Sequence, residues 1–392
     1  MERNIKIAYI VGTFRNAWFW LGVWILFYLS ITNYSGIGIV ESTLFFTAII
    51  LEVPTGALAD ILGKRKTIII SFFLSALCNF GIAYSTNLNN LFISVVLGGI
   101  GMSLYSGAFD ALVYDSLLQD KKESMFNKVL SRITSQQLIM VAVCSAIGGY
   151  LYVYDHHLPF MLCGIFALVA SVLSFFFTEP KLDTEKFSLK NYTKQNTEGF
   201  KHLFNKDLTK IVFFLIIISS FYALSDEMLD SMLGYEFGLS SQMLGILFSV
   251  IALVGALFSY LSGKISKDKD LFYLILILTG LSALTYLLSP IAGVILGSIL
   301  LISRTAIMSV HNNYQSTILN KYIESKYRAT TLSSFNLIKT LPYAISAPFL
   351  GIYMQQITAK NFAFFIAIVL MVVVTVQSLV KKKVLAQQKF LG

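Results

Sequence analysis

Charge is scarce in this chain of 392 residues. Charged side chains make up 13% of the sequence and hydrophobic side chains 56%, whereas a water-soluble chain carries about 25% charged residues. The mean hydropathy is +0.71. Apolar side chains in such excess cannot all be hidden in one water-soluble core, so part of the surface must face lipid. The composition therefore excludes an ordinary water-soluble protein and predicts a membrane protein.

Cysteine and histidine are also rare. Cys78, Cys144 and Cys163 fall inside apolar segments, and they form neither a disulfide framework nor a paired metal-ligand spacing. Of the four histidines, His156 and His157 are adjacent in a short loop, and none has metal-ligand spacing to a carboxylate or thiol. We therefore expect no metal site and no cofactor.

The sequence lacks the motifs G-x-x-x-x-G-K-[ST], H-E-x-x-H and G-x-S-x-G. A pump driven by ATP would need a nucleotide-binding domain, and a hydrolase would need a nucleophile and a base at one depth. No basic domain stands apart from the apolar segments, which argues against a nucleic-acid partner despite the net charge of +9. These absences argue against an enzyme.

Long apolar runs dominate what is present. An α-helix needs about 20 residues to cross a hydrocarbon layer about 30 Å thick. We predict twelve such helices, over residues 7–31, 36–60, 66–87, 91–115, 132–153, 158–178, 209–233, 240–262, 271–289, 291–314, 330–354 and 361–380. The expected fold class is an all-α membrane protein with twelve transmembrane helices.

One polar connector, residues 179–207, divides the helices six and six. We predict a six-helix bundle on each side of it, over residues 1–178 and 208–392. The two halves resemble each other in short stretches, since "YDSLLQDK" (114–121) matches "YQSTILNK" (314–321) at three positions. Parallel six-helix repeats are one architecture of secondary transporters, whose substrate site lies near the bilayer midplane.

The positive charges are distributed unevenly. Nearly all Lys and Arg residues lie in the termini and in the connectors that lead from even-numbered to odd-numbered helices, and Lys360 lies on the opposite side. By the positive-inside rule, both termini and the central connector face the cytoplasm. The net charge thus reflects orientation in the bilayer, which we expect to be the cell membrane.

The stretch "GALADILGKRK" (56–66) joins the second predicted helix to the third. Its chemically notable members are Gly56, Asp60, Gly63, Lys64 and Arg65. The glycines allow close backbone approach and a tight turn, and the cations anchor the turn on the cytoplasmic side. A neighbouring helix N-terminus or an Arg can stabilise the carboxylate of Asp60.

This stretch resembles the helix 2–3 signature of the major facilitator superfamily, G-x-L-A-D-x-x-G-[RK]-[RK]. "EVPTG" (52–56) and "SGAFDALVYDSL" (106–117) resemble one large bacterial branch of that superfamily. The resemblance implies a transporter that works by alternating access, in which Asp60 latches onto the start of the eleventh helix and closes the inner gate. Arg328 is the expected neighbour of Asp60.

Other positions near this gate agree less well with the family. Asp115 and Arg132 are expected to pair at the cytoplasmic face, in the gate or as a structural contact. Val95 stands where many proton-linked members have an Arg before G-x-G. The stretch that ends in Gly148 and Gly149 lacks the two earlier glycines and the proline of the drug antiporters. These departures weaken an assignment as drug/proton antiporter without affecting the fold.

Three ionisable residues of the first half fall at membrane depth, where they are costly and normally face a cavity or a partner. Arg15, Glu52 and Asp110 lie roughly 8–12 Å from the cytoplasmic ends of their helices at a rise of 1.5 Å per residue. Two carboxylates that share one Arg cannot both be fully paired. The group is either a proton- or substrate-coupling site or a structural ion-pair network.

The second half has its own charges at depth. Arg304 and Lys339 can receive an anionic substrate group, or they can balance carboxylates of neighbouring helices. Asp226 and Asp230 are four residues apart and are expected to share one helix face. That face is either a cation-attracting outer vestibule or a solvated helix end.

The remaining candidates are polar or aromatic. Trp18 shares a helix face with Arg15 and either forms an aromatic wall for a substrate or packs against neighbours. Further cavity candidates are Asn16, Gln136 and Asn312.

Together these features predict a secondary transporter, not an enzyme, that moves a small molecule through the bilayer and functions as a monomer. The family branch and the carboxylates at depth favour export in exchange for protons. Coupled uptake of a small metabolite remains an alternative, and a membrane-embedded enzyme or scaffold on the same fold is a more distant one.

Overall fold

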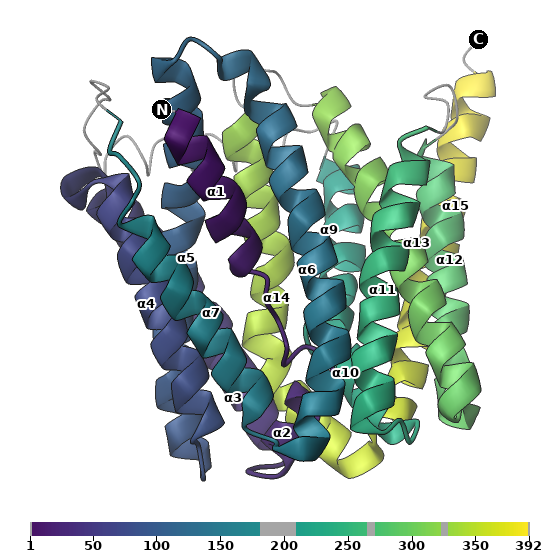
Figure 1. The fold of residues 1–392 in the computed structure, drawn as a ribbon. Helices are drawn as coiled ribbons and strands as arrows, with labels where there is room; N and C mark the ends of the chain where they lie inside the picture. Colours follow the sequence, from purple (N-terminus) through teal and green to yellow (C-terminus); the bar gives the residue numbers. More distant parts are fainter. Residues whose placement is uncertain (1, 181–208, 265–270, 323–327, 391–392) are drawn as a thin grey trace. The chain divides into compact units, whose positions relative to one another are not determined.

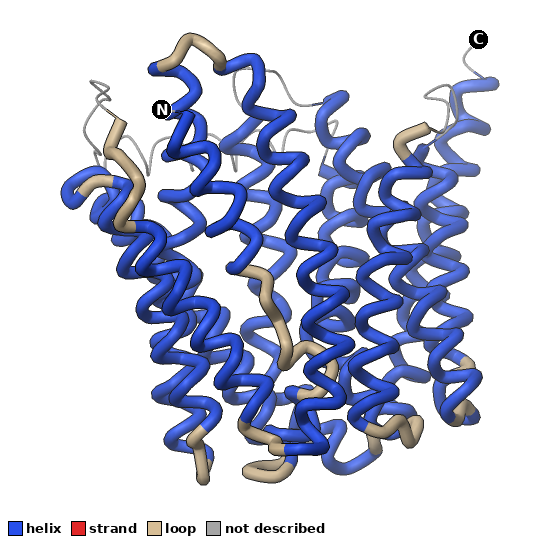
Figure 2. The backbone as a smooth tube through the Cα atoms, viewed as in Figure 1, coloured by secondary structure: helices blue, strands red, loops and turns tan. Residues whose placement is uncertain are grey.

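The computed structural model describes residues 2–180, 209–264, 271–322 and 328–390. Inside its helices the side chains of a few residues, Asp60 and Arg328 among them, lie outside the description. All regular elements of the described residues are helical (Figures 1 and 2). The all-α class expected from the apolar runs is therefore confirmed for this part of the chain.

The elements follow one another with short connections. The first part of the chain forms α1 (Glu2–Phe14), α2 (Trp24–Leu29), α3 (Tyr34–Leu62), α4 (Lys64–Ala83), α5 (Leu88–Gln119), a 3-10 turn (Glu123–Met125), α6 (Phe126–Tyr154) and α7 (Leu158–Ser174). The later part forms α9 (Thr209–Leu224), a π-helical turn (Ser225–Leu229), α10 (Asp230–Glu236), α11 (Ser241–Ser262), α12 (Leu271–Leu287), a 3-10 turn (Ser289–Ile291), α13 (Val294–Tyr322), α14 (Arg328–Ile357) and α15 (Ala359–Phe390).

Ten helices of the described residues are long and apolar enough to cross a membrane, and α7 is apolar but shorter. Capping side chains set where several of them begin. The side chain of Asn33 accepts a hydrogen bond from the backbone N–H of Gly36 before α3, and Asn87 accepts one from Asn90 before α5. The count of twelve crossings and the cytoplasmic position of the termini remain predictions.

The helix predicted over residues 7–31 is not continuous, which corrects the sequence analysis. α1 ends at Phe14, and irregular backbone leads to α2 (Figure 2). Within this stretch the N–H of Trp18 bonds the carbonyl of Asn16, two residues back, instead of four. Apolar composition does not reveal the break, because a buried irregular stretch can be as apolar as a helix.

Irregular backbone at membrane depth is tolerated only where protein or a water-filled cavity satisfies it. Here neighbouring helices do so. The thiol of Cys163 in α7 donates to the carbonyl of Ala17 at 3.1 Å. A Cβ on Gly148 in α6 would overlap the carbonyl oxygen of Phe19, so only glycine allows this approach.

The chain forms two compact units. Unit 1 comprises residues 1–197, 240–253 and 344–352, and unit 2 comprises residues 198–239, 254–343 and 353–392. Each unit has its own apolar core. The core of unit 1 includes Ile68, Phe72, Tyr105, Phe109 and Leu112, and that of unit 2 includes Phe214, Leu215, Ile275, Tyr314 and Phe335. The sequence-based bundles 1–178 and 208–392 remain a prediction.

Two antiparallel crossings of small residues lie within unit 1. At the first, α6 meets the beginning of α11. A Cβ on Gly149 would lie 2.5 Å from the carbonyl oxygen of Ser241, and one on Gly245 would lie 2.6 Å from that of Ser145. The hydroxyl of Ser145 also donates to the carbonyl of Gly245 at 3.2 Å. Close backbone contact of this kind is how membrane helices associate where lipid offers no hydrophobic driving force.

The second crossing joins α3 to residues 344–352 of α14. A Cβ on Gly38 would overlap the carbonyl oxygen of Ala347. The hydroxyl of Ser42 donates to the carbonyl of Ala344 at 2.7 Å. Both crossings thus depend on residues without bulky side chains.

Candidate functional site

Arg15 lies directly after α1, at the start of the irregular stretch, rather than inside a helix. Its guanidinium carbon lies 4.2 Å from the centre of the Tyr105 ring in α5. Tyr105 in turn stacks on Phe109 at 4.8 Å and meets Phe72 edge-on at 5.5 Å. A buried aromatic surface therefore holds the cation in place by a cation–π contact.

Asp110 lies on the same helix as Tyr105, and the charges of Asp110 and Arg15 act on each other. The ion pairs of the described residues do not include one between them. Asp110 is exposed and has no hydrogen bond among the described residues. The structure thus places this carboxylate near a cation without locking the two together.

Glu52 does not join this group. It is half-buried in α3, and no ion pair involves it among the described residues. The sequence placed Arg15, Glu52 and Asp110 at similar depth, but of the two carboxylates only Asp110 lies within electrostatic reach of Arg15.

The exposed face of α5 has a polar part between the exposed apolar residues Met102 and Leu118. It includes Ser106, Asp110 and Tyr114, each four residues from the next. The exposed face of α4, in contrast, includes Ile70, Phe73 and Leu77. Because a carboxylate in hydrocarbon is costly, the polar face of α5 is the part of unit 1 best suited to line an aqueous path.

In unit 2, Arg304 of α13 is almost completely buried and forms an ion pair with Asp230. Its Nε donates to the hydroxyl of Thr285 at 3.2 Å, and its second terminal nitrogen donates to the hydroxyl of Ser289 at 3.5 Å. The ring centre of Tyr286 lies 3.8 Å from the guanidinium carbon. The group is enclosed by protein, so it fits the structural alternative better than a site for an anionic substrate.

Asp226 and Asp230 do not share one helix face, which corrects the second expectation. The chain forms a π-helical turn at Ser225–Leu229, and the hydroxyl of Ser225 donates to the carboxylate of Asp230, five residues on, at 2.7 Å. The wider turn changes the i, i+4 alignment. Asp226 is exposed, whereas Asp230 is buried against Arg304.

Lys339 of α14 is half-buried, and its charge acts on Asp226 and Glu227. Exposed polar residues accompany it on two helices of unit 2, with Asn336 on α14 and Asn312 on α13. Asn312, a cavity candidate from the sequence, is thus exposed on the same unit as Lys339.

The aromatic and amide candidates of the first half have separate surroundings. The indole N–H of Trp18 donates to the carbonyl of Arg15 at 3.1 Å, and the Trp18 ring stacks on Trp20 at 5.6 Å. The hydroxyl of Thr13 lies 3.4 Å from the side-chain oxygen of Gln136. The side-chain oxygen of Asn16 is buried and has no hydrogen-bond partner among the described residues. Buried acceptors without a partner are few in folded proteins, so the Asn16 oxygen stays a candidate for substrate contact.

The motif between α3 and α4 joins the ends of several helices. Gly63 has a φ of 88°, a left-handed conformation that favours glycine. The amide N–H groups of Lys64 and Arg65 donate to the two carboxylate oxygens of Glu179, at 2.7 and 2.8 Å. A carboxylate at a helix N-terminus accepts hydrogen bonds from unpaired N–H groups and interacts favourably with the helix dipole.

Gly56 lies in α3, and the predicted contact of Asp60 with Arg328 lies outside the described residues.

Asp115 forms its ion pair with Lys64, not with Arg132 as the sequence suggested. Arg132 instead lies over the ring of Tyr9, 5.1 Å from its centre. The turn at Gly63 brings Lys64 to the end of α5, where Asp115 is buried. The guanidinium of Arg65 also donates to the carbonyl of Phe175 at 2.7 Å. The motif therefore fastens the ends of α3, α4, α5 and the segment after α7.

We expect Lys64→Met to lower the free energy of unfolding by about 1–3 kcal/mol, because it leaves the largely buried Asp115 carboxylate without its cation. The thermal-unfolding midpoint of the purified protein in detergent measures this. Lys66→Met is the matched control, since Lys66 is exposed and its substitution removes the same charge from the same turn. Equal shifts for the two variants would show that the ion pair contributes nothing.

Sequence reasoning missed several residues of these sites. Glu179 is the acidic residue that follows the sixth apolar run, and its closeness to the basic turn is tertiary. Thr285 and Ser289 are small hydroxyl residues spaced four apart in an apolar segment, which is a usable signal for an interior polar face. Nothing in the sequence singles out Tyr105 as the residue under Arg15.

Known proteins resemble this chain in sequence over nearly its whole length. A family described as Major Facilitator Superfamily matches residues 8–347. The uncharacterized MFS-type transporter YxaM of Bacillus subtilis (strain 168) is 24% identical over 385 residues, which cover 92% of this chain and 91% of the relative.

Two relatives have names that state an activity. Multidrug resistance protein 1 of Bacillus subtilis (strain 168) is 27% identical over 225 residues, 57% of this chain and 56% of that protein. Quinolone resistance protein NorA of Staphylococcus aureus is 26% identical over 178 residues, 45% of this chain and 42% of that protein.

Solved structures share the fold. The nucleoside transporter NupG superposes with a TM-score of 0.77 at 13% identity, over 96% of this chain and 97% of that chain. The D-xylose-proton symporter gives a TM-score of 0.68 at 12% identity, over 94% and 97% of the two chains.

Proposed function

The chain belongs to the major facilitator superfamily of transporters, and from this premise we propose that it exports small amphipathic molecules in exchange for protons. In this proposal it is a monomer in the cell membrane with both termini in the cytoplasm. Residues 1–178 and 208–392 rock against each other so that the substrate has access to one side at a time, and Asp60 takes part in the inner gate.

The state of Asp110 is the observation that carries the proposal. A coupling carboxylate must be able to take up and release a proton, so it needs access to water and must not be fixed in an ion pair. Asp110 is exposed on the polar face of α5, near Arg15 but without an ion pair among the described residues. A proton or a cationic substrate can therefore compete with Arg15 for this carboxylate.

The contrast with Asp230 sharpens this assignment. Asp230 is buried, paired with Arg304 and bonded by Ser225, so proton exchange there would leave a buried cation without its partner. Asp226 is exposed and interacts with Lys339, which makes it the candidate of unit 2. We assign coupling to Asp110 and, second to it, to Asp226.

The partial matches to a multidrug resistance protein and a quinolone resistance protein favour export of amphipathic compounds. The stacked Trp18 and Trp20 next to Arg15 suit a flat, aromatic substrate. Uptake of a small metabolite is the second candidate, and the unpartnered Asn16 oxygen favours it, because a polar substrate could satisfy that oxygen.

We expect Asp110→Asn to abolish proton-coupled transport while the protein remains folded. The test uses inside-out vesicles with an acid interior, a pH-sensitive dye and a panel of chemically diverse compounds. An exporter that exchanges protons releases protons when a compound enters, so the dye signal recovers with the unchanged protein. Asp110→Asn should show no recovery, because the amide cannot carry the proton.

Asp120→Asn is the matched control, since it makes the same chemical change at the end of the same helix. Glu52→Gln tests the other carboxylate of the first half. Full recovery with Asp110→Asn would refute the assignment of the coupling residue. If no compound gives recovery with the unchanged protein, export is refuted for that panel, and counterflow of nucleosides and sugars then tests uptake.

A further inference from the structure

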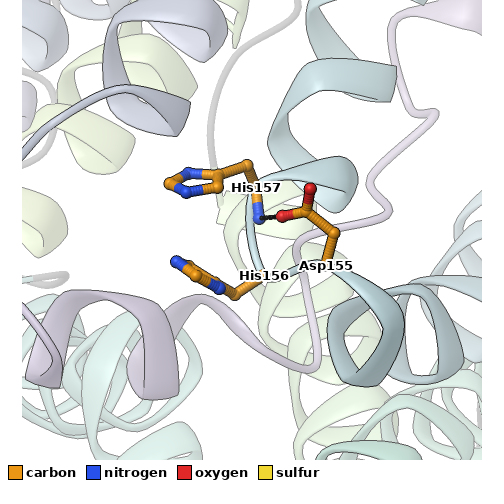
Figure 3. Close-up of side chains that lie close together, drawn as sticks. All are labelled: Asp155, His156 and His157. Carbon is orange, nitrogen blue, oxygen red and sulfur yellow. Dashed lines mark hydrogen bonds between the residues drawn. The ribbon is translucent and has the colours of Figure 1, made fainter.

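The loop between α6 and α7 brings together three side chains that can ligate a metal ion. It consists of Asp155, His156 and His157 (Figure 3). Each residue offers one ligand atom, and these atoms all lie within 4.8 Å of one another. The sequence alone shows no metal-ligand spacing for these histidines, because adjacency along the chain does not reveal where their rings lie.

The rings lie on the same side of the loop. Figure 3 shows the two imidazoles next to each other, and their centres are 4.0 Å apart. The buried ring of Phe27 supports both, at 6.0 Å from His156 and 5.9 Å from His157. Tyr84, which follows α4, stacks on His157 at 6.1 Å. Two imidazoles are thus held side by side by their surroundings.

The hydrogen bonds of His157 decide which of its ring nitrogens can bind a metal. Its Nδ1 is bonded to the carbonyl oxygen of Ala83 at the end of α4. A carbonyl only accepts, so Nδ1 must carry the hydrogen and Nε2 keeps a free lone pair. Metal-binding histidines are usually oriented in this way, with one ring N–H donated to a carbonyl or carboxylate.

Asp155 is also held in position. One of its carboxylate oxygens accepts the backbone N–H of His157 at 2.9 Å, and its own carbonyl accepts the N–H of Leu158 at 3.1 Å. The second carboxylate oxygen has no hydrogen bond among the described residues. The oxygen on the side of the imidazoles is the one that accepts the N–H of His157 (Figure 3), and it keeps a second lone pair with which it can serve as a third ligand.

We propose that Asp155, His156 and His157 bind a divalent transition-metal ion of the Zn²⁺ type, with water at the remaining position. Imidazole nitrogens and one carboxylate suit zinc, nickel or copper, whereas magnesium and calcium prefer oxygen ligands. Two ligands at about 2.1 Å from a tetrahedral ion lie about 3.4 Å apart. The ligand atoms of the loop lie within 4.8 Å of one another, so binding requires side-chain rotations that shorten their separations to that spacing.

Such an ion would connect helices at one end of unit 1. His157 is bonded to the end of α4, the loop joins α6 to α7, and Phe27 belongs to α2. An ion that binds only the folded loop stabilises it by mass action. The site is separate from Asp110 and does not depend on the proposed transport activity.

The test is zinc binding by the full-length protein in detergent, with any affinity tag removed, measured by calorimetry. The variant to compare is His156→Ala, because His156 is exposed and has no hydrogen bond among the described residues. His157→Ala and Asp155→Asn complete the set. His202→Ala is the control for a histidine elsewhere in the sequence.

We expect the unchanged protein and His202→Ala to bind about one zinc ion with equal affinity. Each loop variant should bind at least about tenfold more weakly, and magnesium should not compete. Zinc should also raise the thermal-unfolding midpoint of the unchanged protein but not that of His156→Ala. Equal zinc affinity in His156→Ala and the unchanged protein would overturn the proposal, as would the absence of zinc binding by the unchanged protein.

Discussion

Arg304→Met is expected to lower the free energy of unfolding by about 3–5 kcal/mol, because it leaves the carboxylate of Asp230 buried without its cation. Arg304 is 1% exposed and bonds Asp230, Thr285 and Ser289. Water cannot replace these contacts without opening unit 2. The measurement is the unfolding midpoint in detergent, together with the yield of monodisperse protein.

The double variant Arg304→Met/Asp230→Leu separates the ion pair from the packing around it. Removing both charges abolishes the cost of a buried unpaired group, so the double variant should be more stable than Arg304→Met alone. Lys339→Met is the control for loss of one cation at membrane depth. If the pair is structural, the double variant should still transport.

A folded double variant that has lost transport would contradict the structural role of this ion pair. It would return Arg304 or Asp230 to the coupling or substrate site, which is one of the alternatives that the sequence leaves open.

Gly245→Ala is expected to disrupt the crossing of α6 and α11. The added Cβ would lie 2.6 Å from the carbonyl oxygen of Ser145 and 2.8 Å from the Cα of Gly149, and both obstacles are backbone atoms. Overpacking of this kind costs about 1–3 kcal/mol. A cost of that size shifts a two-state equilibrium about 5- to 150-fold. If alternating access requires this crossing to separate, the variant should favour the separated state.

Thiol labelling of Ser241→Cys in a background without Cys78, Cys144 and Cys163 measures that shift. Ser241 lies at the crossing, since its carbonyl oxygen is the neighbour of Gly149. Gly280→Ala is the matched control, because a Cβ there meets nothing within 4 Å. We expect the labelling rate to rise at least about fivefold with Gly245→Ala only. Equal rates in the two variants would show that this crossing does not restrict the equilibrium.

The two variants concern different kinds of contact. Arg304 is held by polar groups from several elements of unit 2, so its loss is a loss of folding energy. Gly245 permits an approach of two helices within unit 1, so its substitution changes which arrangement of α6 and α11 is favoured. Stability measurements distinguish the two variants, because only Arg304→Met should lower the unfolding midpoint by the full cost of an unpaired buried charge.

Helix positions follow from the sequence because hydrophobic length is a local property. A run of about 20 apolar residues satisfies its own backbone hydrogen bonds only as a helix when water is absent. The runs over 36–60, 91–115 and 240–262 correspond to α3, α5 and α11 within a few residues. The basic turn after Leu62 was equally predictable, since glycine and consecutive cations end an apolar run.

Departures from regular helix geometry were not predictable in the same way. The stretch from Arg15 to Val23 is apolar enough to be helical, yet its backbone is irregular. Cys163 of α7 donates a hydrogen bond to one of its carbonyl groups, and Gly148 of α6 leaves room for its close approach. The π-helical turn at Ser225–Leu229 accompanies the bond of Asp230 with Arg304, a residue far along the chain.

The choice of partners for each charge also belonged to tertiary structure. The sequence alone predicted an all-helical transporter of this family, and it predicted which ionisable residues stand at membrane depth. Only the folded chain decided that Asp115 meets Lys64, that Arg304 is enclosed with Asp230, and that Asp110 is left exposed beside Arg15. Each residue of a segment contributes to its hydrophobicity, so the hydrophobicity of the segment can be calculated from the sequence. An ion pair needs two atoms at one place in space, and that place exists only once the helices have packed.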